Sequence, residues 1–546
     1  MPGDVAQRRV IIEVAGFEAK RVWRHPALIV GVLLTAYELY QQVDWSRAPV
    51  LNRDSFASAW PMIFLAAGAF FAIGSAANRR HTVEDDDPLR GLPVSPTTQA
   101  VGVGLAFVSP LLVGLLMQGT VLTLRALDSS VTSLVWPEVL TGPVTVALGA
   151  AAGLAVGFGF RSALALPLAA VGLGGAVVTM WWANSGYLLG PYTPWLAPVT
   201  SLDWNQYAYE QVYRPSGPHL AYLLLLTGTL GAAATIRGRE DRGRLISISA
   251  VIVLLAGTVF FGLSQLAELT PAEEAARQAP YNPTTADYVC EQRGTVTYCA
   301  YPGYEEWIDE WAAQVEPVIA SIPGDIAAGP IEVRQQIPYF NDDDADFPAP
   351  RGYIRAGMWW SRRPFDSSLV AHPLGMALAP AGLAVGLPTD DLPIRIAVAD
   401  GEIVAESVDD PADVDPEDFL YRSCLADGQA RAVAALWYAA NASPEAAEGL
   451  EFLSSGERYG HVSENENFAI DIGYRQPASS VIYFRKEALT ALDLFALPPD
   501  DVGNTLAQHW TEVTDPATTT EELAGWFGLS VPEMGDTDDM GSIPCP

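Results

Sequence analysis

Residues 237–267 read RGREDRGR (237–244) followed by LISISAVIVLLAGTVFFGLSQLA (245–267). A helix needs about 20 mostly apolar residues to cross the hydrocarbon core of a bilayer, so the second part of this stretch predicts a membrane span. Up to Glu268 the chain carries 17 acidic and 17 basic side chains, whereas the rest carries 47 acidic and 14 basic ones, the whole net charge of −33. The stretch therefore joins a charge-balanced half to a strongly acidic half.

Six further apolar runs, separated by short charged loops, precede this span. The seven predicted spans are 27–40, 60–77, 100–122, 140–160, 163–183, 219–236 and 245–267. The first is the weakest because Glu38 lies inside it, and we expect Pro110 and Pro167 to kink the third and the fifth. No predicted span carries a central pair of charged residues, which disfavours an ion-coupled carrier. The fold class we expect is an α-helical multi-pass membrane domain of about seven spans.

The distribution of Arg and Lys between the loops predicts the orientation of the spans, because cytoplasmic loops are enriched in these residues. With the N-terminus inside, the basic residues of the cytoplasmic segments are Arg8, Arg9, Lys20, Arg21, Arg24, Arg79, Arg80, Arg90, Arg161, Arg237, Arg239, Arg242 and Arg244. Those of the opposite loops are Arg47, Arg53, Arg125 and Arg214. The bias predicts a cytoplasmic N-terminus, and an odd number of spans then places everything after Glu268 outside.

Three glycines recur every four residues along the fourth predicted span, at Gly149, Gly153 and Gly157. This spacing puts them on one helical face, where the missing side chains allow the backbone of another helix to approach closely. The alternative is that small residues are simply common in membrane proteins of this composition. We expect a helix-packing face at these positions.

Two cytoplasmic segments accompany the first spans. Residues 8–23 can form an amphipathic helix with Val10, Val14 and Phe17 on one face and basic residues around it, as in helices that lie in a membrane interface. Between the second and third spans lies NRRHTVEDDDPLRGLPVSPTTQ (78–99). In this loop basic residues are followed by a short acidic-to-apolar helix, and Leu-Pro-Val-Ser-Pro returns the chain to the membrane.

This arrangement resembles the permease subunits of ABC-2 type transporters. In that family an interfacial elbow helix precedes the first span, and a loop of the form R-x-x-x-T-x-E-x-L-x-x-x-P-V-S docks on the ATPase subunit. The resemblance covers about residues 1–245 and implies six core spans, an ABC ATPase subunit in trans, and a homodimer or a heterodimer with a similar permease.

The docking loop that the resemblance implies consists of Glu84, Asp85, Asp86, Asp87, Leu89 and Leu92. The triple acid at 85–87 departs from the family, which more often has apolar and small residues there. The alternative is a generic loop with an acidic turn. The chain contains no Gly-Lys-Ser/Thr and hence no P-loop, which agrees with a motor on another chain.

All four cysteines lie in the acidic half, at Cys290, Cys299, Cys424 and Cys545. Disulfides persist outside the cytoplasm, so this placement supports an extracytoplasmic location. Cys290 and Cys299 flank a hairpin-like stretch with Gly294 at its turn, and we expect a disulfide between them. Cys424 with Cys545 completes the pairing, although four cysteines allow three connectivities and a reduced Cys424 in a helix is the alternative.

The acidic half alternates between helix and strand patterns, which predicts an α+β domain. Helical spacing covers 304–322, 366–387, 415–441, 444–454, 500–513 and 519–528. Strand patterns cover 331–337 and 353–360, and 394–407 alternates around Asp400-Gly401 as in a hairpin.

The acidic half contains neither a zinc-peptidase motif nor a Gly-x-Ser-x-Gly motif, and a hydrolase with a Ser/His/Asp triad from distant residues is a weaker alternative. A zinc peptidase with the common helical motif needs two His one turn apart with a Glu between them. The sequence HPLGM, which begins at His372, has the first His but neither the Glu nor the second His. His461 and His509 lack ligand-type neighbours at helical spacing. The acidic runs 341–346 and 409–418 do not match an EF-hand loop, so we expect solvated loops in preference to a calcium site. We expect no enzymatic activity, no metal, no cofactor and, because of the negative charge, no nucleic-acid partner.

These features predict a multi-pass protein of the cell membrane whose spans contact membrane lipid. The predicted domains are the amphipathic elbow helix (1–25), a six-span permease-like domain (26–244), a seventh transmembrane helix (245–268) and the acidic extracytoplasmic α+β domain (269–546). The resemblance implies a permease that moves a substrate with a separate ATPase. The alternative is a membrane-anchored extracytoplasmic binding protein or degenerate peptidase-like protein, whose spans serve only as an anchor.

Overall fold

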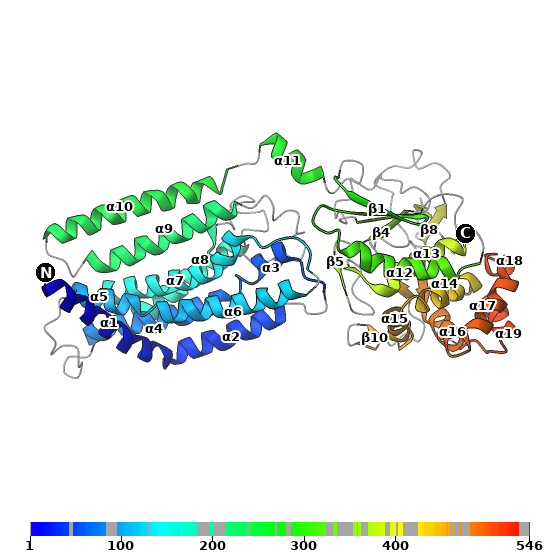
Figure 1. Cartoon of the computed structure of the whole chain (residues 1–546), viewed down its shortest axis with the longest axis horizontal. Coiled ribbons are helices and arrows are strands. Elements are labelled where there is room, and N and C mark those ends of the chain that lie inside the picture. Colours follow the sequence, from blue (N-terminus) through cyan, green and yellow to red (C-terminus); the bar gives the residue numbers. More distant parts are fainter. Residues whose placement is uncertain are drawn as a thin grey trace. The chain divides into compact units, whose positions relative to one another are not determined.

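The computed structural model of this chain describes most of its residues. It describes residues 2–42, 47–82, 96–128, 130–160, 162, 164–182, 196–199, 215–236, 241–267, 270–279, 286–323, 331–335, 353–356, 359–361, 370–387, 394–399, 402–407, 424–455, 457–458, 461–462, 469–471, 481–533 and 545. By its internal packing the chain divides into two compact units (Figure 1). The first comprises Met1–Asp44 and Pro49–Arg277, and the second comprises Trp45–Ala48 and Gln278–Pro546.

The first unit is built of helices. They are α1 (Pro2–Trp23), α2 (Pro26–Gln42), α3 (Leu51–Ala57), α4 (Met62–Thr82), α5 (Pro96–Leu105), α6 (Val108–Leu127), α7 (Trp136–Gly159), α8 (Ala165–Trp182), α9 (Ser216–Thr235), α10 (Asp241–Ser264) and, at the boundary, α11 (Pro271–Gln278). Within the described ranges, four helical stretches are long and apolar enough to cross a membrane: Leu51–Arg79, Val101–Leu127, Trp136–Gly159 and Arg244–Ser264. The apolar helices Pro26–Gln41 and Ala165–Met180 are shorter.

The third predicted span, 100–122, is interrupted. The backbone turns at Ala106 and Phe107 between α5 and α6. Pro110 explains the break, because it has no N–H to donate to the carbonyl of Ala106 four residues earlier and its ring crowds that carbonyl. Instead, the backbone N–H and the hydroxyl of Ser109 both donate to the oxygen of Ala106, at 3.3 and 3.0 Å.

Helices α4 and α7 pack along each other at the centre of the first unit, with α2 on the other side of α4 and α9 against α7. Helix α10 packs on α9, and α1 packs on α5. Apolar side chains of α4 and α7, such as Leu65, Ile73 and Val146, are fully buried between them. By contrast, Val171 of α8 and Val253 of α10 are about 70% exposed, at 74% and 69%, as expected for helices that face lipid.

The second unit contains both helices and small sheets. Its helices are α12 (Trp307–Ser321), α13 (Pro373–Ala384), α14 (Ala430–Ala440), α15 (Pro444–Ser455), α16 (Arg485–Phe495), α17 (Pro499–Gln508), α18 (Trp510–Val513) and α19 (Thr520–Trp526). A four-stranded sheet has the order β1 (Val289–Arg293), β2 (Val296–Ala300), β3 (Ile331–Gln335), β4 (Tyr353–Ala356). The β1–β2 pair is antiparallel and the other two pairs are parallel, with α12 as the crossover between β2 and β3.

The other strands of the second unit form shorter sheets. The sheet of order β12 (Ala469–Asp471), β13 (Val481–Phe484), β9 (Cys424–Leu425) has three strands. The paired strands are β5 (Trp359–Trp360) with β6 (Val370–Ala371), β7 (Ile394–Ala399) with β8 (Glu402–Ser407), and β10 (Glu457–Arg458) with β11 (His461–Val462). The β7–β8 pair is antiparallel, as expected for the hairpin around Asp400-Gly401.

Two helices predicted in the acidic half begin later than expected. Helix α13 begins at Pro373 and not at 366, because the residue before a proline is held extended and His372 has φ −140° and ψ 160°. Helix α14 begins at Ala430 and not at 415, because Gly428 has φ +70°, a left-handed conformation that a helix cannot contain. Both helices are buried along their lengths and form the core of the second unit.

The disulfide predicted between Cys290 and Cys299 is confirmed: it joins directly opposite residues of β1 and β2. Gly294, with φ +58°, makes the turn between these strands. The expectation that Cys424 lies in a helix is wrong, since its backbone lies in β9. Cys545 is also disulfide-bonded, and its predicted pairing with Cys424 stays a prediction.

Candidate functional site

Helix α1 packs against the other helices of the first unit through one narrow face. Val14, Glu18 and Val22, spaced four residues apart, are almost fully buried, whereas Ile12 and Phe17 on other faces are exposed. Of the predicted apolar face, Val14 is buried, Val10 is half-buried and Phe17 is 41% exposed. The exposed apolar side chains suit a helix that lies along a membrane surface.

The contact of α1 with α5 depends on a glycine. A Cβ added at Gly102 of α5 would lie 2.7 Å from the Cγ1 of Val14, so α1 and α5 could not keep this contact without a shift. Helix α1 also reaches α4, where Arg79 donates a hydrogen bond to the buried carboxylate of Glu18 at 2.9 Å. Helix α4 ends at Thr82 and α5 begins at Pro96, so these two helices flank residues 83–95. Helix α1 contacts both of them.

The predicted docking residues lie between these two helices in sequence. Glu84, Asp85, Asp86, Asp87, Leu89 and Leu92 all fall within 83–95, outside the described residues. The structure therefore gives the two ends of the predicted docking loop and the helix that contacts both flanking helices.

The three glycines of the fourth predicted span all face α4. A Cβ added to Gly149, Gly153 or Gly157 of α7 would lie 2.2 to 2.5 Å from a backbone oxygen of α4, closer than any real Cβ contact. These oxygens belong to Ala66, Phe70 and Gly74. Glycine is thus required at each position for the two backbones to approach closely.

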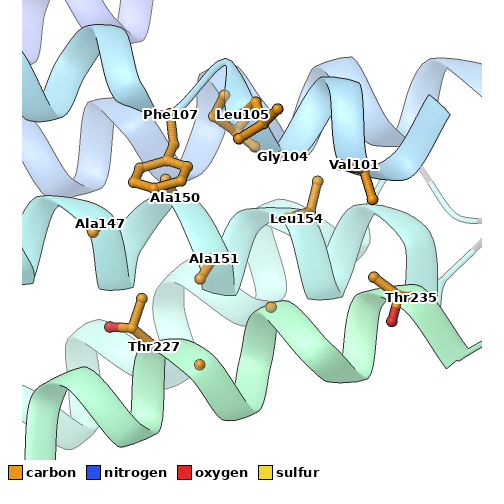
Figure 2. A pocket seen from close by; sticks show the side chains of 13 residues that line it. Val101, Gly104, Leu105, Phe107, Ala147, Ala150, Ala151, Leu154, Thr227 and Thr235 are labelled. Carbon is orange, nitrogen blue, oxygen red and sulfur yellow. The ribbon is translucent and has the colours of Figure 1, made fainter. Parts of the chain in front are cut away.

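A cavity of about 300 Å³ lies between α4, α5, α7 and α9 (Figure 2). Its described walls are formed mainly by alanine, glycine and aliphatic side chains, and among these residues only Thr227 and Thr235 of α9 add hydroxyl groups. Figure 2 shows Ala147, Ala151 and Leu154 of α7 between the α5 side and the α9 side of this space. No sequence pattern singled out these residues, because they come from four separate helices.

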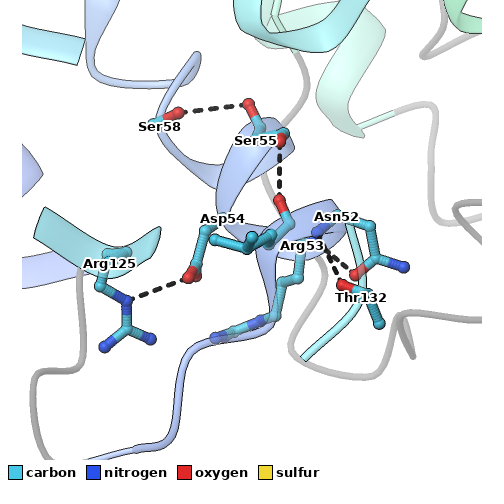
Figure 3. A network of polar contacts seen from close by, with 8 residues as sticks. Asn52, Arg53, Asp54, Ser55, Ser58, Arg125 and Thr132 are labelled. Atoms are coloured by element: carbon cyan, nitrogen blue, oxygen red, sulfur yellow. Dashed lines mark hydrogen bonds and ion pairs between the residues drawn. The ribbon is translucent and has the colours of Figure 1, made fainter. Parts of the chain in front are cut away.

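At the end of the bundle opposite α1, helix α3 carries a buried ion pair (Figures 1 and 3). The Nε of Arg125, in the last turn of α6, donates to Oδ2 of Asp54 at 3.0 Å, and both side chains are more than nine-tenths buried. The sequence pattern placed Arg125 in a loop and indicated no central charged pair within the predicted spans. No local signal marks the pair, because Asp54 and Arg125 are 71 residues apart and each has an oppositely charged residue closer in sequence.

Hydroxyl and amide groups extend the contacts of the Asp54–Arg125 pair. The amide of Gln118 in α6 donates to Oγ of Ser58 at 3.0 Å, and the N–H of Val135, just before α7, donates to Oγ of Ser55 at 3.3 Å. The N–H of Asn52 donates to Oγ1 of Thr132 at 3.1 Å, as seen in Figure 3. Together these bonds hold α3 to α6 and to the start of α7.

Thr132 lies in the connection between α6 and α7 and has φ +65°. This left-handed conformation is costly for a β-branched residue and persists only where the surrounding structure holds it. The backbone N–H of the neighbouring Val131 donates to the oxygen of Pro49, which fixes this connection to the start of α3. The strained residue, Thr132, is hydrogen-bonded to Asn52 of α3, the helix that also carries Asp54.

The second unit holds a buried carboxylate, Glu487, at the start of α16. Its Oε1 accepts hydrogen bonds from the N–H of Gly428 at 2.9 Å and from the hydroxyl of Thr520 at 3.1 Å. The Nζ of Lys486 lies 3.8 Å from the same oxygen and 3.1 Å from Oδ1 of Asp427. Burial is the main cause that raises the pKa of Glu487 to about 7, while Lys486 opposes the shift and Asp427 adds to it.

The histidines of the acidic half take structural positions where their side chains are described. The Nδ1 of His372 accepts a hydrogen bond from the N–H of Gly375 and so caps the start of α13. The ring of His509 stacks on that of Trp526 with centroids 4.4 Å apart. No group of three metal-binding side chains occurs among the residues that the structure describes. The acidic runs 341–346 and 409–418 lie outside those residues.

Comparisons with known proteins identify no relative of this chain. No family model, no curated protein and no solved structure matches the chain.

Proposed function

We propose that this chain is the membrane-spanning permease subunit of an ABC-type transporter, which moves a substrate across the cell membrane together with a separate ATPase subunit. The observation that supports it most is the position of α1. This helix packs on α5 and forms the Glu18–Arg79 ion pair with α4, the two helices that flank residues 83–95. A force applied by an ATPase to the loop would thus act on α1, α4 and α5 together.

The proposal includes seven spans and a cytoplasmic N-terminus. The four stretches of sufficient length and apolarity supply part of this set, and the apolar helices α2, α8 and α9 supply the rest. In this topology α1 and residues 83–95 lie on the cytoplasmic side, where an ATPase has access to them. The second unit then lies outside the cell, where its disulfides persist.

The test is co-purification from native membranes. We expect the tagged full chain in mild detergent to recover a protein with a P-loop and ATPase activity. Replacing both Leu89 and Leu92 by Asp places uncompensated carboxylates in the proposed interface, so recovery should fall by about tenfold or more.

The matched control is Val289→Asp, which makes the same kind of change at an exposed position of β1 in the second unit. This variant should recover the ATPase as well as the unchanged chain does. If the unchanged chain recovers no ATPase, or if the Leu89/Leu92 variant recovers it undiminished, the proposed docking loop is wrong.

One observation favours a second candidate function, an extracytoplasmic binding protein with a membrane anchor. The second unit is comparable in length to the first and has its own core, centred on α13 and α14, and its own disulfide. A chain truncated after Arg277 separates the two functions. If the truncated chain still recovers the ATPase, the helical unit is a permease. If neither form recovers one, the binding protein is the better explanation.

A further inference from the structure

The cavity between α4, α5, α7 and α9 has a composition suited to one class of ligand. Of its lining residues, only Thr227 and Thr235 carry polar side-chain atoms. The hydroxyl of Thr227 donates to the oxygen of Leu223, and that of Thr235 donates to the oxygen of Ala232, each at 2.8 Å. Both donors are thus already used within α9, and the cavity offers an apolar surface to whatever enters it.

The volume of the cavity agrees with an apolar ligand. About 300 Å³ is at the lower end of the range for small-molecule sites. Apolar cavities of even half this volume stay dry and take up hydrocarbon ligands, because water finds no hydrogen-bond partners there. Water is therefore a poor occupant of this space.

Small side chains in the walls leave the cavity unfilled, and the cavity is open toward the surface of the bundle. A Cβ built at Gly231 meets no atom within 4 Å, so this position borders free space. Leu105, at the end of α5, lines the cavity and is also 41% exposed. Helix α5 ends at this residue, and α6 begins at Val108, so Leu105 and Phe107 line the cavity at the interruption between the two helices.

We propose that this cavity binds an alkyl chain. The same hydrocarbon chemistry is carried by a membrane phospholipid and by a free fatty acid, and both have access to an opening on the apolar surface of a membrane helix. The head group stays outside, since the described residues that line the cavity offer it no free donor or charge. This inference rests on the cavity alone and holds whether or not the chain works with an ATPase.

The experiment is photo-cross-linking of the full chain in lipid nanodiscs. One sample contains a phosphatidylethanolamine with a diazirine in its acyl chain, and a second contains a diazirine fatty acid. Labelled peptides are identified by mass spectrometry. We expect label on lining residues of α5, α7 and α9, besides a background on lipid-facing residues such as Val253.

Gly231→Leu fills the cavity with a side chain from within. Labelling of the lining peptides should fall by about tenfold relative to the background at Val253, the effect of displacing roughly two buried methylene groups. The matched control is Gly172→Leu in α8, where an added Cβ also meets no atom within 4 Å but which does not line the cavity. This control should label like the unchanged chain.

A second variant covers the case in which Gly231→Leu does not fold. Thr227→Val keeps the shape of the side chain and removes its hydroxyl, so an apolar ligand should bind undiminished. Loss of labelling in Thr227→Val would show a polar ligand and overturn the proposal, as would lining peptides labelled no more than the Val253 background. Labelling by the phospholipid probe identifies a resident membrane lipid, and labelling by the fatty acid alone identifies a single-chain ligand.

Discussion

The guanidinium of Arg125 and the carboxylate of Asp54 are both withdrawn from water at the end of an apolar bundle. Removing one partner of such a pair leaves the other charge buried and uncompensated, at a cost of about 3–5 kcal/mol. We therefore expect Arg125→Ala to lower the stability of the first unit by about this amount. Unfolding in mixed detergent, followed by tryptophan fluorescence, measures the change.

The double variant supplies the control for this prediction. Asp54→Ala combined with Arg125→Ala leaves no isolated charge, so its loss of stability should be smaller than the sum of the two single losses. Additive losses would mean that the pair contributes no coupling, and that its burial has another cause.

We expect Glu487 to make the stability of the second unit depend on pH. Its pKa is raised from 4.5 to about 7 in the folded chain, mainly by burial. The folded state then holds the proton more tightly than the unfolded state, so this contribution is fully present below about pH 4.5 and is lost as the pH rises toward 7. A shift of this size corresponds to about 3 kcal/mol. We expect hydrogen exchange in α14, corrected for its intrinsic rate, to become faster over this range.

Glu487→Gln tests the assignment because glutamine cannot titrate. Its side-chain oxygen can still accept from Gly428 and Thr520, so the fold is retained and exchange in α14 should become independent of pH between about 4.5 and 7. Glu521→Gln, at an exposed neighbouring position, should keep the pH dependence of the unchanged chain. An equal response in both variants would exclude Glu487 as the titrating group.

Helices α4 and α7 approach so closely that a single methyl group should separate them. A Cβ at Gly153 would lie 2.2 Å from the oxygen of Phe70, which belongs to backbone and cannot rotate away. We expect Gly153→Ala to destabilise the first unit by about 1–3 kcal/mol, as overpacking does. Thermal unfolding in detergent gives the measurement. Gly159→Ala, in the last turn of the same helix where a Cβ meets nothing within 4 Å, should leave stability unchanged within about 0.5 kcal/mol.

The apolar runs located the helices of the first unit, because a hydrophobic stretch of this length is a property of the chain alone. Their ends were harder to predict. The sequence predicted a kink at Pro110, but it did not show that the turn would lie at Ala106 and Phe107, between α5 and α6. In the second unit, β12, β13 and α16 were not predicted, since short buried strands and helices cannot be told apart by pattern.

The candidate sites divide in the same way. The glycine repeat at Gly149, Gly153 and Gly157 was visible because its members lie on one helix. The lining of the cavity and the Asp54–Arg125 pair bring together residues of different helices, up to 162 positions apart between Ile73 and Thr235 in the cavity. No local pattern marks such residues.

Across the whole molecule, the proposed topology predicts different exposure of the two halves to the medium. In right-side-out spheroplasts, added protease should cleave the chain after Glu268 and leave a protected fragment that carries the N-terminus. Disrupting the membrane should then expose the N-terminal segment as well. Cleavage of the N-terminus in intact spheroplasts would show that the N-terminus lies outside. The proposed docking loop would then lie on the side of the membrane that an ATPase cannot reach.

The chain passes between the two units at more than one point. Residues Trp45–Ala48, between α2 and α3, group with the second unit, where the N–H of Ala48 donates to the oxygen of Trp360 at 2.8 Å. The next residues return to the first unit, where Leu51 donates to the oxygen of Val131.

The sequence by itself determined the partition of this protein into a charge-balanced apolar part and an acidic part with all the cysteines, because hydropathy and charge are sums over the chain. It also determined the helical runs and the β1–β2 disulfide, which depend on neighbours in sequence. Only the tertiary structure decided which charges are buried together, where α1 packs and where a cavity remains. These features arise from the meeting of distant helices, whose packing depends on the shape of every side chain between them.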